Sequence, residues 1–201
     1  MPQFSAHPLQ EQFVIISTGT VQLEGNLVIP GGASSIILFA HGSGSSRHST
    51  RNRYVASVLQ QEGLATLLLD LLTVEEEEID LRTRQLRFNI GLLATRLVGA
   101  TDWLLHSQLT PSLNMGSSLN VGYFGASTGS AAALIAATQR ADVVKAIVSR
   151  GGRPDLAGAA LAQVKAPTLL IVGGNDFPVI GINEDALALL PEATEKQLTI
   201  V

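Results

Sequence analysis

The stretch Gly125-Ala126-Ser127-Thr128-Gly129 decides how the rest of this 201-residue chain is interpreted. The mainly apolar residues 119–124 before it predict a short buried strand, and the small residues 130–137 after it predict a helix. A G-x-S-x-G pattern between strand and helix is typical of a sharp, strained turn that holds a serine hydroxyl above a parallel sheet. Glycines are needed on both sides, because a side chain there would collide with the neighbouring strand and helix. Ser127 is therefore a candidate nucleophile, and a tight turn without chemistry is the alternative.

The order of elements around this turn predicts an α/β protein. Residues 13–16 and 21–29 predict an antiparallel hairpin, since a Thr18-Gly19-Thr20 turn separates them. From residue 35 onward strands alternate with helices, which is typical of a parallel sheet with crossover helices. A hydrophobic content of 46% with only 15% charged residues suits strands that are buried on both faces. We expect strands at 35–40, 64–70, 119–124, 144–149, 167–172 and 197–201, and helices at 52–62, 81–106, 127–138 and 183–190.

Composition and charge exclude several classes of protein. The net charge of −4 argues against nucleic acid or an anionic membrane as the main partner. The chain contains no cysteine, which excludes disulfides, thiolate metal sites and a cysteine nucleophile. The sequence has no basic-then-apolar N-terminal segment and no apolar run of membrane-spanning length. The acidic run 75–78 is expected to be a solvated loop or a helix start. We therefore expect one cytoplasmic domain over residues 1–201, without a signal peptide, metal or cofactor.

A second informative element, His41-Gly42-Ser43-Gly44-Ser45-Ser46-Arg47, directly follows the strand expected at 35–40. Where a nucleophile lies on a G-x-S-x-G turn, the loop after this strand donates one N–H to the oxyanion hole, and the residue after the nucleophile donates the other. Glycines let that backbone approach the developing oxyanion closely. We assign the two donors to Ser43 and Thr128. A Gly/Ser linker is disfavoured by the preceding strand, and a phosphate-binding loop by the absence of G-x-x-x-x-G-K-[ST].

An acidic turn follows the strand expected at 167–172. Gly173-Gly174-Asn175-Asp176 places Asp176 where an α/β-hydrolase holds the carboxylate that orients its histidine. The order of Ser127 and Asp176 matches the hydrolase order of serine, acid and histidine. An ordinary turn residue is the alternative for Asp176, since Gly, Asn and Asp favour turns. No histidine follows Ser127 in the sequence, although this fold normally supplies its general base from there.

Two histidines and two arginines are candidate substrate contacts. His41 immediately follows a strand and precedes the loop glycine, so we expect it chiefly to orient its own loop. His48 lies at a predicted helix start near the mouth of the site, and a surface position is the alternative. Arg150 and Arg153 flank a Gly-Gly turn at the end of the strand expected at 144–149, where a guanidinium would suit a substrate carboxylate. The alternative for both is an ion pair with Asp70, Asp102 or Asp155.

Six segments carry a resemblance to a known family: His41–Arg47, Asp70–Thr73, Ala100–Leu104, Gly122–Gly129, Ser149–Gly158 and Pro167–Asp176. Through them the chain resembles the dienelactone-hydrolase-related α/β-hydrolases, of the bacterial kind sometimes fused to a phosphoribosyltransferase domain. The resemblance implies an α/β-hydrolase fold, with a mostly parallel, doubly wound sheet after the N-terminal hairpin. It also implies Ser127 as the nucleophile, Asp176 as the triad acid, and a histidine in a loop that would begin just beyond Val201.

The sequence departs from the family pattern in two ways. The strand expected at 197–201 ends at the terminus, so residues 1–201 lack the family's histidine loop and closing helix. Either the chain lacks its natural C-terminal tail, or it is a homologue without a base, and an apolar strand that ends flush with the terminus favours the first. In addition, dienelactone hydrolases proper use a cysteine nucleophile, whereas this chain has a serine.

The sequence therefore predicts a serine hydrolase that cleaves a small carboxylic ester or lactone, provided that a histidine follows Val201. Thioesterase and peptidase activities on the same triad are not distinguished, because leaving-group preference lies in pocket shape. The alternative is a non-catalytic hydrolase-fold protein that binds a ligand or a partner. A small molecule is the expected partner, and a homodimer is left open.

Overall fold

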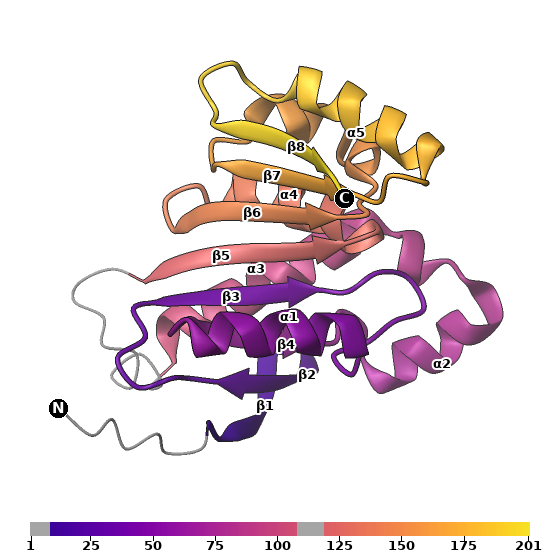
Figure 1. Cartoon of the computed structure of the whole chain (residues 1–201). Helices are drawn as coiled ribbons and strands as arrows, with labels where there is room; N and C mark the ends of the chain where they lie inside the picture. The colour runs from indigo at the N-terminus through magenta and orange to yellow at the C-terminus, as the bar shows by residue number, and fades with distance from the viewer. Residues whose placement is uncertain (1–8, 108–118) are drawn as a thin grey trace, which may run out of the picture.

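The computed structural model describes residues 9–107 and 119–201, and within them eight strands form one sheet (Figure 1). The strands are β1 (Glu11–Thr18), β2 (Val21–Val28), β3 (Ser35–Ala40), β4 (Ala65–Leu69), β5 (Asn120–Ala126), β6 (Val144–Arg150), β7 (Thr168–Val172) and β8 (Lys196–Ile200). Their order in the sheet is β1-β2-β4-β3-β5-β6-β7-β8. β2 pairs with β1 and β4 in antiparallel fashion, and the other neighbours are parallel. The predicted mostly parallel sheet with an antiparallel N-terminal hairpin is confirmed.

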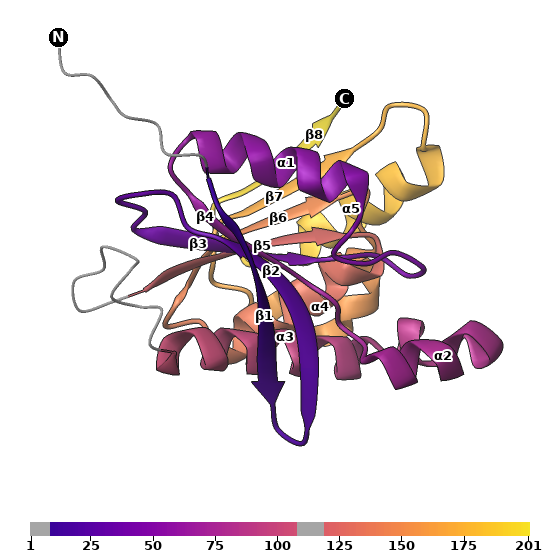
Figure 2. The ribbon, with the colours of Figure 1, turned by 90° about the horizontal axis from the view of Figure 1, so that it is seen from below.

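Helices cover both faces of the sheet (Figure 2). One face carries α1 (Thr50–Gln61), and the other carries α3 (Ile90–His106), α4 (Thr128–Gln139) and α5 (Phe177–Leu189), with the 3-10 segment η2 (Pro154–Gln163). α2 (Val74–Thr83) lies beyond the carboxyl ends of the parallel strands, and the short η1 (Leu86–Phe88) follows it (Figure 1). No helix in the described part of the chain is both long and apolar enough to span a membrane.

The hydrophobic core has one part on each face of the sheet. The larger part joins the sheet to α3 and α4, and the smaller part lies under α1, where the Phe39 and Phe124 rings are 5.0 Å apart between centroids. The buried residues of α4 are mostly Ala, Gly, Ser and Thr. Because these side chains are small, α4 approaches the sheet closely, and this fixes the turn between β5 and α4 against the end of β3.

The single helix expected at 81–106 is wrong, because the chain turns there between α2 and α3. Arg84 ends α2 in a left-handed conformation with φ of 56°. The buried carboxylate of Asp80 holds the turn, since it accepts hydrogen bonds from the N–H groups of Leu86 (2.7 Å) and Arg87 (3.1 Å). Leu86 packs against the same core as α3. The apolar spacing therefore continues across the break, which is why periodicity alone predicted one helix.

The structure also shows where two of the helices begin. The helix expected at 183–190 begins earlier, at Phe177, with a proline in its first turn, a position that tolerates proline because no N–H is needed there. The acidic run 75–78 lies in the first turns of α2, as the helix-start interpretation has it. Thr73 caps that helix: its Oγ1 accepts from the Glu76 N–H (3.2 Å), and the Glu76 carboxylate accepts from the Thr73 N–H (2.9 Å).

Candidate active site

Ser127 lies in a sharp turn between β5 and α4. Its backbone has φ of 49° and ψ of −122°, a combination that residues with a side chain rarely adopt. The Ser127 carbonyl accepts hydrogen bonds from the N–H groups of Ser130 (3.1 Å) and Arg153 (3.1 Å), and the Ser127 N–H donates to the carbonyl of Arg150 (3.4 Å). The end of β6 and the loop after it therefore brace the turn. Strain that the surroundings maintain in this way gathers at functional sites.

Three glycines make room for this turn. A Cβ at Gly125 would lie 2.5 Å from the α4 backbone, and one at Gly129 would lie 2.2 Å from the carbonyl oxygen of Ala40. A Cβ at Gly42, in the loop after β3, would lie 2.9 Å from the Ser127 Cβ. The spacing of glycines around Ser127 therefore has the steric basis that the sequence predicted, and the loop after β3 lies directly against the serine.

Ser127 borders a cavity of about 890 Å³ at the carboxyl edge of the sheet. Its walls come from the loop after β3, the N-terminus of α1 and the ends of β6, β7 and β8. The lining includes Ser43, Arg150 and Asp176, so the fold brings these three candidates together with Ser127. The other candidates named from the sequence do not line this cavity: Thr128, His41, His48 and Arg153.

The two N–H groups assigned to an oxyanion hole have no acceptor among the described residues. Ser43 is half-buried in the loop that contacts Ser127, and Thr128 is the first residue of α4. Neither backbone N–H donates a hydrogen bond to another residue within 9–107 or 119–201. The first N–H groups of a helix have no partner inside the helix, so the Thr128 donor is free by its position. Two such donors beside one serine suit a developing negative charge.

Asp176 follows β7 and stands at the start of α5. Its backbone is bonded at both ends: the N–H donates to Gly173 O (3.0 Å), and the carbonyl accepts from the Ile180 N–H (2.9 Å). Its side chain makes no capping hydrogen bond and is exposed at the cavity. The residue after β8, Val201, lies next to the same turn, since its carbonyl oxygen accepts a hydrogen bond from the Gly174 N–H (2.8 Å). A carboxylate and the end of the described chain thus lie at the same cavity as Ser127.

Arg150 and Arg153, for which the sequence predicted the same two alternatives, have different environments. Arg153 pairs with Asp155, with Nε and Nη2 at 2.8 and 2.7 Å from the carboxylate oxygens, and this pairing raises the pKa of Arg153. Arg150 has only a long contact from Nη2 to Asn52 Oδ1 (3.4 Å), and its buried Nε has no partner among the described residues. Burial, and then the nearby charge of Arg51, lower the pKa of Arg150. Arg150 therefore faces the cavity as an unpaired cation.

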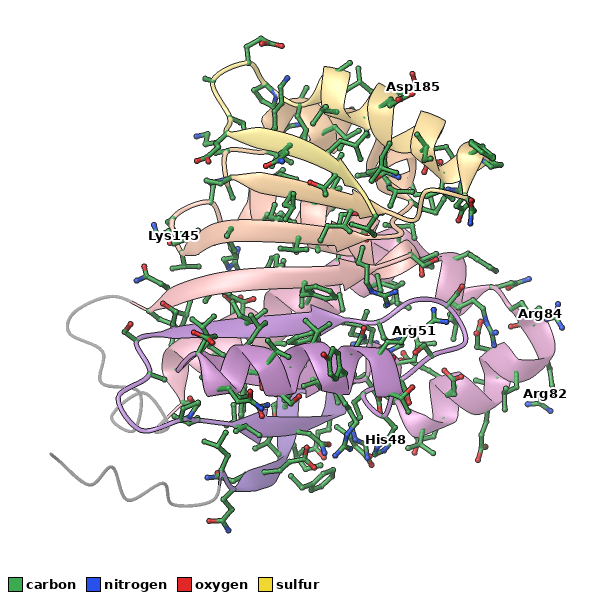
Figure 3. The ribbon with its side chains drawn as sticks, viewed as in Figure 1. His48, Arg51, Arg82, Arg84, Lys145 and Asp185 are labelled. Atoms are coloured by element: carbon green, nitrogen blue, oxygen red, sulfur yellow. The ribbon has the colours of Figure 1, made fainter. Side chains whose placement is uncertain are left out.

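None of the described histidines lines the cavity of Ser127. His41 is buried, and its Nε2 accepts a hydrogen bond from the Leu71 N–H (3.1 Å), so Nδ1 must carry the proton that it shares with Gly42 O (2.9 Å). Both ring nitrogens are then occupied, which fits a residue that orients its own loop. His48 is exposed on the side of the β1–β2 hairpin (Figure 3). His7, which the sequence predicts to be a surface residue, lies outside the described residues.

The sequence did not anticipate the contribution of α1 to the cavity. Arg51 and Asn52, in the first turn of α1, both line it. Figure 3 shows Arg51 near the carboxyl edge of the sheet. No pattern in the sequence marks these two residues. Asn52 is a polar residue that is almost fully buried, but burial depends on the fold and cannot be seen in the sequence.

Comparison with known structures and proteins places the chain among hydrolases. No family model matches it. It is 68% identical to a dienelactone hydrolase from Anabaena variabilis, with a TM-score of 0.91, and the match covers 97% of this chain and 87% of that one. Est1E from Butyrivibrio proteoclasticus is 13% identical with a TM-score of 0.72 over 94% of this chain and 88% of its own, a likeness of fold alone.

The curated relatives are longer proteins. Two proteins from strains of Mycobacterium tuberculosis, both described as putative phosphoribosyl transferases, are 53% identical over 194 residues. The match covers 96% of this chain, and the chain spans only 41% of their length. The match therefore involves less than half of each of these longer proteins.

Proposed function

This chain belongs to the dienelactone hydrolase family of α/β-hydrolases, and on that premise we propose that it is a serine hydrolase that cleaves a small carboxylic ester or lactone through an acyl-enzyme. The observation that carries the proposal is the strained turn at Ser127, which borders one cavity together with Ser43 and Asp176. A serine held in a costly backbone conformation beside two free N–H donors is the arrangement that acyl transfer needs.

The reaction proceeds in two halves. Ser127 Oγ attacks the carbonyl carbon and gives up its proton to a general base, while the electron pair of the C=O bond moves to oxygen. The N–H groups of Ser43 and Thr128 hold that oxyanion, and its collapse breaks the bond to the leaving oxygen, which takes the proton. Water then attacks the acyl-serine ester with help from the same base, and this releases the carboxylic acid and restores Ser127.

The general base is proposed to be a histidine that follows Val201 in the complete protein and is oriented by Asp176. None of the described histidines lines the cavity of Ser127. Val201 does line it, and its carbonyl is bonded to Gly174, two residues before Asp176. Sequencing the gene past the codon of Val201 tests this directly. A histidine within about ten codons supports the triad, and a stop codon supports the alternative of a non-catalytic ligand- or partner-binding protein.

Arg150 is proposed to hold a carboxylate on the substrate. Arg150 lines this cavity without a carboxylate partner among the described residues, and its buried Nε has no hydrogen-bond partner there. The first turn of α1 adds a second cation, Arg51, to the same wall. A guanidinium can bind a carboxylate through two parallel hydrogen bonds. Arg150→Met should raise KM for an ester that carries a second, ionised carboxyl group and leave KM for its neutral analogue unchanged. Arg153→Met is the matched control, and equal effects of Arg150→Met on both esters would contradict the assignment.

The test of the proposed function is ester turnover by the protein expressed from its complete gene. Ser127→Ala should abolish hydrolysis of p-nitrophenyl acetate, because the substitution removes the hydroxyl on which the acyl-enzyme forms. Ser130→Ala, three residues away in α4, removes a buried hydroxyl that has no hydrogen-bond partner in the described structure and should leave turnover unchanged. Undiminished activity in Ser127→Ala would refute the proposal. A cytoplasmic location stays a prediction of the sequence, and a homodimer stays open.

A further inference from the structure

Two sequence motifs far apart in the chain meet at one ion pair. Arg47 ends the loop that follows β3, and Asp70 is the first residue after β4. The Arg47 backbone N–H donates to Asp70 Oδ1 (2.6 Å), and the guanidinium Nη1 donates to the other oxygen of the same carboxylate. The side chains are only 14% and 19% exposed. The proposed chemistry uses neither residue, and neither lines the cavity of Ser127.

The remaining donors of Arg47 bind the neighbouring strand. Nη2 forms an ion pair with Glu24 (2.6 Å), and Nε donates to Asn26 Oδ1 (3.0 Å), both on β2. The guanidinium carbon also lies 5.7 Å from the centre of the Phe13 ring on β1. One side chain therefore connects the loop after β3 to β1, to β2 and to the residue that follows β4, a set of contacts that a lysine with its single ammonium could not make.

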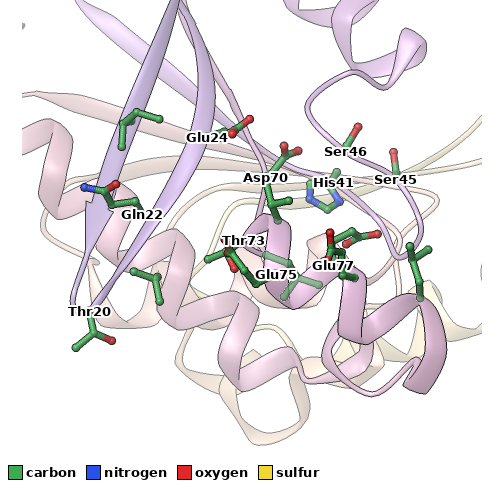
Figure 4. A pocket seen from close by; sticks show the side chains of 16 residues that line it. Thr20, Gln22, Glu24, His41, Ser45, Ser46, Asp70, Thr73, Glu75 and Glu77 are labelled. Carbon is green, nitrogen blue, oxygen red and sulfur yellow. The ribbon is translucent and has the colours of Figure 1, made fainter.

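The same loop is anchored at its other end. His41 Nε2 accepts from the N–H of Leu71, the residue next to Asp70. His41, Ser45, Ser46 and Asp70 all line a neighbouring cavity (Figure 4). The loop is thus fixed at both ends to two consecutive residues, with five residues between His41 and Arg47 left to span the gap.

Those five residues include the proposed oxyanion donor. They turn through a hydrogen bond from the Ser45 N–H to Gly42 O (3.1 Å), and Gly44 has a φ of 69°. Gly42 lies against Ser127, since its Cβ would be 2.9 Å from the Ser127 Cβ. The position of the Ser43 N–H relative to Ser127 is therefore set by the two anchors, because the short turn between them has little freedom of its own.

We propose that Arg47 is a positioning residue for the hydrolysis: by binding Asp70 and Glu24 it holds the Ser43 N–H where the oxyanion forms. This inference rests on the proposed function. Removal of one oxyanion donor costs about 100- to 1,000-fold in kcat in serine hydrolases, and misplacement by about 1 Å can cost about 100-fold. Loosening the anchor keeps the donor present but misplaced for part of the time. We therefore expect kcat to fall about 10- to 100-fold in Arg47→Ala, with KM changed less than about threefold.

The kinetic test compares Arg47→Ala, Arg47→Lys and Asp70→Asn with Arg140→Ala, with rates expressed per active site titrated. Arg140 forms a similar two-pronged pair with Asp102 (Nε to Oδ1, 2.6 Å) away from the cavity, so Arg140→Ala is the matched control for loss of a paired arginine. A merely structural role would lower the fraction of active sites and leave kcat per site unchanged. Binding of a boronic acid that mimics the tetrahedral state should weaken by the factor lost in kcat/KM, while binding of the product acid stays the same. Asp70→Asn keeps an oxygen acceptor and should lose less than Arg47→Ala.

Amide hydrogen exchange on the free protein tests the anchor without any reaction. Peptides that cover residues 41–47 should exchange faster in Arg47→Ala and Arg47→Lys than in the wild type or Arg140→Ala. An unchanged exchange rate in these peptides would show that Arg47 does not hold the loop in place, whether or not the protein is a hydrolase. Faster exchange with kcat per site within threefold of the wild type overturns the positioning role alone. A wild-type protein from the complete gene that turns over no ester refutes the proposed function, and the positioning role with it.

Discussion

Replacing Gly129 with alanine probes how closely α4 packs against the end of β3. A Cβ at this position would lie 2.2 Å from Ala40 O and 2.5 Å from His41 O, whereas real Cβ atoms keep at least 3.0 Å from such neighbours. Both oxygens are main-chain atoms at the end of a central strand. Neither can rotate away as a side chain would, so the start of α4 must move as a unit.

Two effects of opposite sign decide the outcome. Alanine is about 1 kcal/mol better than glycine inside a helix, which favours the variant. Overpacking of a well-packed core costs about 1–3 kcal/mol and occasionally more, and the contact with two fixed carbonyls puts this site at the upper end. We expect Gly129→Ala to lower the free energy of unfolding by about 2 kcal/mol net. Because the shift also moves Ser127 relative to the loop after β3, kcat should fall about 100-fold.

Urea unfolding followed by circular dichroism measures the first effect. The midpoint should fall by about 1 M with an unchanged slope, since the variant alters the native packing and not the extent of unfolding. Gly181→Ala is the matched control, because a Cβ there meets nothing within 4 Å and its helix, α5, should gain about 0.5–1 kcal/mol. A Gly129→Ala protein as stable as the wild type would refute the close approach on which the turn at Ser127 depends.

Two further substitutions have expected outcomes that follow from single contacts. Tyr123→Phe removes a buried hydroxyl that is 2.7 Å from Thr101 Oγ1 and should lower the free energy of unfolding by about 1 kcal/mol. Burial raises the pKa of Tyr123 from 10.0 to about 12, so its contribution to stability is complete below pH 10 and is lost as the pH rises to 12, because the unfolded tyrosine ionises first. Urea titrations across that range should show this loss in the wild type and not in Tyr123→Phe; parallel curves would contradict the assignment. Asp155→Asn breaks a pair with Arg153 whose side chains are 42% and 36% exposed, so it should cost less than about 1 kcal/mol and leave ester turnover unchanged. A large loss of turnover would contradict this and give the Arg153–Asp155 pair a part in the reaction.

The sheet was predictable from the sequence because its strands are short apolar runs with clear ends. The strand expected at 35–40 agrees with β3 residue for residue. The helical region was less predictable, since the break near Arg84 depends on the buried carboxylate of Asp80, and the apolar pattern gives no sign of it. η2 was not predicted at all, and Gly158, with a φ of 53°, interrupts any helical pattern there.

The geometry of the candidate site was predictable from the sequence at the turn of Ser127, where the motif has a steric cause. The glycines around Ser127 are needed for the close contacts of its turn, so the pattern itself carried the geometry. Arg150 and Arg153 could not be told apart in the sequence, because both flank the same Gly-Gly turn. The structure separates them: Asp155 neutralises Arg153 locally, while Arg150 points into the cavity beside Asn52.

If Ser127 is an activated nucleophile, it reacts covalently with reagents that modify such serines. The protein expressed from its complete gene is incubated with a fluorophosphonate, which reacts with activated serines, and the labelled peptide is identified by mass spectrometry. We expect one label per chain, on Ser127, together with loss of ester turnover in proportion to labelling. A protein that hydrolyses the ester while Ser127 stays unlabelled, or that is labelled at another residue, would contradict this role of Ser127.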